Sequence, residues 1–88
     1  MSIDVEQILE LHETMSQFEE IVLSFLKKTR RGYQLGEMAL LFFSEKKDVA
    51  AALSLMAMPI QHLQKLGHVV KVYDPETISE YFYARGIL

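Results

Sequence analysis

Few side chains in this 88-residue chain could take part in covalent chemistry. There is no cysteine, and the three histidines, His12, His62 and His68, have no second ligand at the short helical spacing of a zinc site. Early carboxylates such as Glu6 and Glu10 are placed like a solvated helix face rather than an acid–base pair. The four glycines are isolated, so no phosphate-binding loop is present. We therefore expect no enzymatic activity, no cofactor and no metal site.

The polar groups best placed for recognition lie in one short segment between apolar residues. If Ile60 and Leu63 face the core, then the polar side chains that alternate with them on the same helix point toward solvent. Glutamine can pair with adenine, and lysine can reach guanine or phosphate. The expected recognition residues are Gln61, His62, Gln64 and Lys65. An ordinary solvated face is the alternative interpretation.

The net charge of −3 is unevenly distributed along the chain. Residues 1–26 sum to −6, residues 27–73 to +5, and residues 74–88 to −2. An acidic arm and a basic centre could orient the protein on an anion, and an acidic solvent face on the first helix is an equally good explanation. Candidate phosphate contacts in the basic centre are Lys27, Lys28, Arg30, Arg31, Lys46, Lys47 and Lys71.

Size and composition indicate a single domain, residues 1–88, because 50% hydrophobic and 24% charged residues are ordinary for a globular protein. A chain this short buries a modest share of its surface, so we expect a homodimer to add stability. The acidic N-terminus does not resemble a signal peptide, and no apolar run approaches the length of a membrane helix. We therefore expect a cytoplasmic protein with no membrane partner.

The first segment, residues 1–31, has the pattern of a long amphipathic helix, expected over residues 3–30 and ended by Gly32. Its apolar residues recur at alternating spacings of three and four. This stripe could cover the domain's own core or pair with a second copy, and its length favours the second copy. The expected dimer interface is Ile8, Leu11, Met15, Phe18, Val22 and Phe25.

The rest of the chain predicts a buried helix over residues 34–44, a helix over 46–54, and another that begins near Pro59 and ends at Leu66. A run of valines predicts a strand over residues 68–73. The sequence Asp74-Pro75-Glu76 then has the form of a helix start, and Gly86 would end that last helix.

Residues 46–65 resemble a helix-turn-helix. The small Ala50, beside Val49, would allow close helix approach, Leu53 and Leu55 would bracket the turn, and Ile60 and Leu63 would hold the second helix. The segment Leu66–Val70 and the Asp74-Pro75-Glu76 start resemble small winged regulators of the excisionase kind. Over residues 33–85 this resemblance implies a mostly α, winged helix-turn-helix-like fold with a long N-terminal helix and one short strand or wing. It also implies duplex DNA as partner, in transcription regulation or as a plasmid or phage accessory factor.

Two features depart from that family. Ser54 stands where the turn usually has glycine, and Met56-Ala57-Met58 is apolar where such proteins commonly offer polar groups to DNA. The alternative is a protein-interaction adaptor or chaperone whose methionine-rich surface docks a partner. A face shared by residues 27–31 with Lys46, Lys47 and Lys65 would favour DNA binding. Residues 27–31 pointing elsewhere, with Met56 and Met58 in an open apolar patch, would favour the adaptor.

Overall fold

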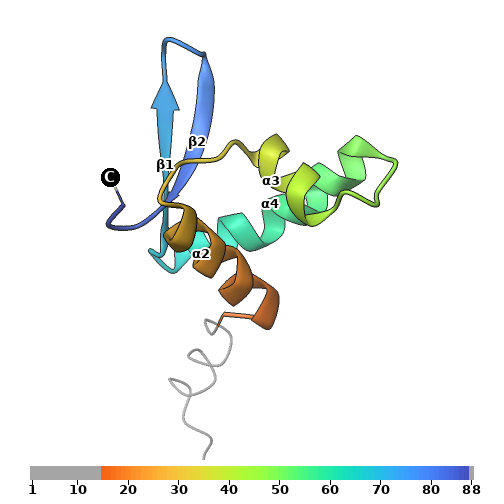
Figure 1. Cartoon of the computed structure of the whole chain (residues 1–88), viewed down its shortest axis with the longest axis horizontal. Helices are drawn as coiled ribbons and strands as arrows, with labels where there is room; N and C mark the ends of the chain where they lie inside the picture. The colour runs from red at the N-terminus through yellow and green to blue at the C-terminus, as the bar shows by residue number, and fades with distance from the viewer. Residues whose placement is uncertain (1–14, 88) are drawn as a thin grey trace, which may run out of the picture.

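Three helices and a two-stranded antiparallel sheet make up the part of the chain that the computed structural model describes, residues 15–87 (Figure 1). The helices are α2 (Gln17–Thr29), α3 (Leu35–Phe42) and α4 (Val49–Lys65). The strands are β1 (Val69–Asp74) and β2 (Ser79–Ala84). The domain is a small α+β unit in which helices predominate, and its strands form a hairpin where the sequence predicted a single strand.

Helix α2 begins after Ser16 because that residue and Glu19 form a reciprocal cap. The Ser16 hydroxyl accepts a hydrogen bond from the Glu19 N–H at 3.1 Å, and the Glu19 carboxylate accepts one from the Ser16 N–H at 2.7 Å. The helix ends at Arg30, whose φ of 54° is left-handed. The predicted C-terminal end is therefore confirmed, whereas an unbroken helix through residues 15 and 16 is wrong. The earlier part of the predicted helix lies outside the described residues.

The apolar stripe of α2 covers the chain's own core. Val22 and Leu26 are fully buried, and Phe18 and Phe25 each place their rings within 6 Å of the Phe42 ring of α3, at 5.6 and 5.3 Å. Met15 also packs against the core. Val22 is thus not available to a second copy. The described part of the stripe covers the chain's own core, as the first of the two alternatives proposed. Of the expected dimer interface, Ile8 and Leu11 lie outside the described residues.

Helix α4 is unbroken across the segment where the sequence predicted a turn. The buried side chains Ala52, Met56, Ile60 and Leu63 follow one another at helical spacing, so a single side of α4 faces the core. Met56, expected in a turn, is fully buried, and Pro59 lies in the helix interior. The predicted pair of helices over 46–54 and 59–66 is therefore wrong, because core contacts on both sides of Pro59 favour one helix.

The helix predicted over residues 34–44 is confirmed as α3, although it is not buried all round. Met38 and Ala39 face the core, whereas Leu40 is 70% exposed and Leu41 is 56% exposed. Val49, which was expected at the contact between two helices, is also 65% exposed. Leu40 connects the other two, because it borders one groove with Val49 and another with Leu41. We call these three side chains the α3 patch.

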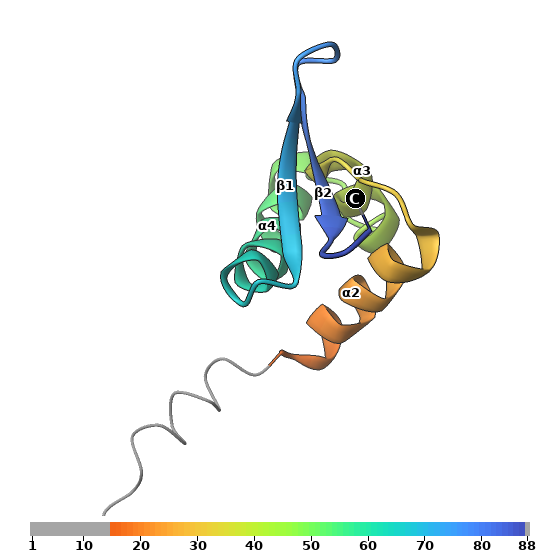
Figure 2. The same cartoon turned by 90° about the vertical axis from the view of Figure 1, so that its left-hand side faces the viewer.

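The hairpin replaces the helix predicted after Asp74. The Asp74 carboxylate accepts a hydrogen bond from the Glu76 N–H at 3.0 Å, which closes a turn instead of capping a helix. Residues 81–84 then alternate between half-buried and buried, and β2 pairs with β1 in a register from Val69↔Ala84 to Asp74↔Ser79. Tyr33 bridges the other edge of β2 at Phe82. The far end of the hairpin projects beyond the helices in both views (Figures 1 and 2).

Candidate functional site

The side of α4 that faces away from the core is open to solvent along the length of the helix. Its exposed residues are Ala50, Ser54, Met58, Gln61 and Lys65, and their spacing of three and four places them on one stripe. We call this set the α4 stripe. Gln61 and Lys65 were expected to face outward, and both are exposed. The stripe is almost uncharged, since Lys65 is its single ionic group.

Cationic groups lie near both ends of the α4 stripe. Lys46 and Lys47 are exposed in the loop that leads into α4, and Lys65 is in the last turn of the helix. None of the three forms an ion pair with another residue of 15–87. Asp48 is the N-cap, and its carboxylate accepts a hydrogen bond from the Ala50 N–H at 3.0 Å. The lysines are therefore available to an anionic partner that lies along α4.

His62 does not belong to the α4 stripe, contrary to expectation. Its Nδ1 lies 2.5 Å from the Oε2 atom of Glu19, and that carboxylate is buried. Burial alone would raise the pKa of Glu19, but the Ser16 N–H, the His62 ring and the Ser16 hydroxyl together outweigh it, so the pKa is lowered. His62 therefore connects α4 to the start of α2. Because 43 positions separate the pair, local spacing gave no signal of it.

Two other expected recognition residues also do not belong to the α4 stripe. Gln64 lies one turn after Gln61 on nearly the same side of α4, but it is half-buried and therefore less accessible than Gln61. Lys71 lies on β1, where its ammonium group is 2.9 Å from the Glu80 carboxylate on β2. Both members of that cross-strand pair are about half exposed, with side-chain exposures of 49% and 51%. The structure thus keeps Lys71 away from the α4 stripe and leaves Gln64 beside it but only partly accessible.

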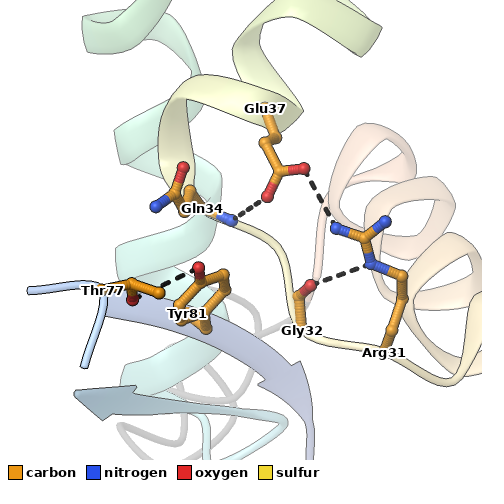
Figure 3. Close-up of polar contacts among 6 residues, drawn as sticks. All are labelled: Arg31, Gly32, Gln34, Glu37, Thr77 and Tyr81. Carbon is orange, nitrogen blue, oxygen red and sulfur yellow. Dashed lines mark hydrogen bonds and ion pairs between the residues drawn. The ribbon is translucent and has the colours of Figure 1, made fainter. Parts of the chain in front are cut away.

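The cluster at residues 27–31 has a different location and includes an arginine with a structural role (Figure 3). Arg31 donates to the Glu37 carboxylate at 3.0 Å and to the Gly32 carbonyl at 3.1 Å, and its guanidinium lies 4.1 Å from the Tyr33 ring centroid. The other Glu37 oxygen accepts from the Gln34 N–H at 3.0 Å. Arg31 therefore holds the connection between α2 and α3.

This connection and the loop that carries Lys46 and Lys47 lie on opposite sides of the molecule. The connection pairs with the hairpin where Tyr33 bridges Phe82, whereas residues 43–48 lie at the far end of α4 (Figure 1). Lys27, Lys28 and Arg30 are exposed at the α2 end. Residues 27–31 therefore do not share a face with Lys46 and Lys47, which counts against the DNA hypothesis, while the burial of Met56 leaves no open Met56–Met58 patch for the adaptor hypothesis.

The hairpin tip is acidic and holds one strained residue. Asp74 and Glu76 carry its charge, and the Tyr81 hydroxyl lies 3.5 Å from that of Thr77 (Figure 3). Ile78 has a φ of 53°, a region that β-branched residues rarely adopt, and its side chain is 78% exposed. The tip is therefore unsuited to hold phosphate groups.

The sequence reasoning missed the α3 patch, because an apolar helix of eight residues gives no clue to which side is covered. Leu40 and Val49 border a groove of about 420 Å³ between α3 and α4. Its other main lining residues are Ala39, Phe43, Lys46 and Leu53. This groove is a second surface with the character of a binding site.

Residues 15–87 contain no group of three or more His, Cys, Asp or Glu residues that could hold a metal ion. Within the same range, no helix combines the length and the apolar character that crossing a membrane requires. Comparisons of the chain with protein-family models, curated proteins and solved structures find no match.

Proposed function

We propose that this chain is a winged helix-turn-helix protein that binds duplex DNA with α4. In this proposal α3 and α4 are the helix pair, and the β1–β2 hairpin is the wing. The order of elements supports it: a helix, the short Tyr33 bridge, two helices and a hairpin follow one another as in winged-helix domains. The proposal moves the recognition helix from residues 59–66 to the whole of α4.

The observation that carries the proposal is the open α4 stripe with lysines near both of its ends. A helix fits the major groove, which is about 12 Å wide, when one side is fixed by the core and the other is free. The uncharged residues of the α4 stripe would contact base edges, while Lys46, Lys47 and Lys65 would reach phosphates on either side. Gln61, within the stripe, can pair with adenine.

Fluorescence anisotropy with a labelled duplex, at several salt concentrations, tests this function. We expect affinity to fall as salt rises, because phosphate contacts release counterions. The double change Lys46→Ala and Lys47→Ala should make the slope of log affinity against log salt shallower by about 2. The matched control is Lys27→Ala with Lys28→Ala, which removes the same charge at the far end of α2 and should change the slope much less.

Affinity that does not depend on salt, or equal effects of the two double changes, would contradict the proposal. Equal effects would mean that net charge, rather than the position of the lysines beside α4, controls binding. Absence of binding to any duplex at low salt would leave no support for a DNA-binding function.

The α3 patch supports a second candidate function, a protein-interaction module. Leu40, Leu41 and Val49 are each more than half exposed, and Leu40 and Val49 border the groove between α3 and α4, which is typical of contact surfaces. Sedimentation velocity tests its simplest form, in which the partner is another copy of the chain. A dimer that Leu40→Ser and Leu41→Ser dissociate would support this function, and a monomer at all concentrations would exclude self-association.

A further inference from the structure

We infer that the α4 stripe selects duplexes by the 5-methyl groups of pyrimidines in the major groove. This inference rests on the proposed function, because it names the kind of DNA that α4 would bind. The evidence is the chemical character of the stripe. Ala50 and Met58 are its exposed apolar members, and Met58 is 69% exposed. Burial of this side chain against an apolar group of a partner would be favourable.

The composition of α4 excludes the commonest polar way of recognising guanine. The helix, Val49–Lys65, contains no arginine, asparagine or acidic residue, so it cannot form the bidentate arginine–guanine contact. Its lysine is at the last turn, where a phosphate contact suffices to explain it. Along the remaining length of the stripe, the base-edge feature that fits an alanine or methionine is the methyl group of thymine.

The dimensions of the stripe agree with this assignment. At 1.5 Å rise per residue, Ala50 and Met58 lie about 12 Å apart along the helix axis. That distance corresponds to about three to four base-pair steps of duplex DNA. The two apolar side chains could therefore contact one or two separate methyl groups. Gln61, one turn beyond Met58, would then face a base pair in which adenine is the preferred partner.

The test uses alternating duplexes, in which every binding register presents the same groups. Alternating A·T duplex is compared with the same duplex in which deoxyuridine replaces thymidine, a change that removes the methyl and keeps the pairing edges. Burying one methyl group contributes about 0.8 kcal/mol, so we expect about fourfold weaker binding for each contacted methyl. Alternating G·C duplex with 5-methylcytosine should bind more tightly than unmethylated G·C by a similar factor.

Variants connect the effect to the stripe. Met58→Ala should reduce the ratio of thymidine to deoxyuridine affinity while keeping salt-dependent binding. Leu41→Ala, which removes an exposed apolar side chain from α3, should leave that ratio unchanged. Salt-dependent binding with equal affinity for the two A·T-type duplexes would overturn the inference and leave the proposed function standing. Absence of binding to every duplex would overturn both.

Discussion

Replacing Pro59 by alanine should make the protein more stable, which is an unusual effect for a proline. Proline has no N–H, so the Leu55 carbonyl lacks its helical hydrogen bond where α4 passes through Pro59. Proline also disfavours a helix interior by about 3 kcal/mol relative to alanine. If Pro59 instead began a helix after a turn at residues 55–58, its missing N–H would have no helical partner to lose. The variant therefore distinguishes one helix from two.

The expected gain is smaller than the full proline penalty. The Pro59 side chain is half-buried and lines a groove with Phe18, Leu55 and Met58. Shortening it to alanine removes partly buried methylene groups, a loss of about 1 kcal/mol. The net increase in the free energy of unfolding should therefore be about 2 kcal/mol. For a domain of this size, that increase corresponds to a rise in Tm of roughly 10 °C.

Chemical denaturation followed by far-UV circular dichroism measures this difference. Pro75→Ala is the matched control, because Pro75 lies in the exposed hairpin turn and the change should lower stability by about 0.5 kcal/mol through the unfolded state. An unchanged or reduced free energy of unfolding for Pro59→Ala would refute the unbroken α4. A gain for both proline variants would point to a general effect unrelated to the helix.

The remaining predictions concern the buried carboxylate and the hairpin tip. Glu19→Gln should lower the free energy of unfolding at neutral pH by about 2 kcal/mol, whereas the exposed Glu20→Gln should change it little. Because the pKa of Glu19 is lowered on folding, its contribution is present above its pKa in the unfolded chain and is lost as the pH falls through the folded value. Denaturation across the acid range should therefore show the difference between wild type and Glu19→Gln shrinking, and a constant difference would contradict the assignment. Ile78→Asn should raise the free energy of unfolding by about 1 kcal/mol, because asparagine tolerates the left-handed φ of 53°. A lower Tm for this variant in thermal unfolding would show that the tip is not strained.

Local signals in the sequence predicted several elements correctly. The existence of α3 and of strand β1 depends on nearby residues such as the valines before Tyr73, and the position of the α2 end was also predicted, although the left-handed residue that ends this helix is Arg30 rather than Gly32. Two signals had more than one structural meaning. Pro59 suits a helix start, but burial of Met56 and Ile60 favours one continuous helix. Asp74 caps helices and also closes turns, and Tyr33 pairing with Phe82 favours the strand.

The candidate site was predictable only where a side chain has no tertiary contact. The outward position of Gln61 and Lys65 follows from helix geometry alone, once Ile60 and Leu63 are assigned to the core. His62 was misplaced because Glu19 lies far away in the sequence. The exposure of Leu40 likewise depends on which side of α3 the other helices cover, and spacing within α3 does not contain that information.

The most direct test of DNA binding through α4 is the change in backbone amide NMR shifts when a duplex is added at low salt. DNA binding through α4 predicts that the largest changes follow the α4 stripe and the loop before it. These residues are Lys46, Lys47, Ala50, Ser54, Met58, Gln61 and Lys65. Changes confined to Lys27, Lys28 and the hairpin, with α4 unaffected in a protein that binds the duplex, would contradict it.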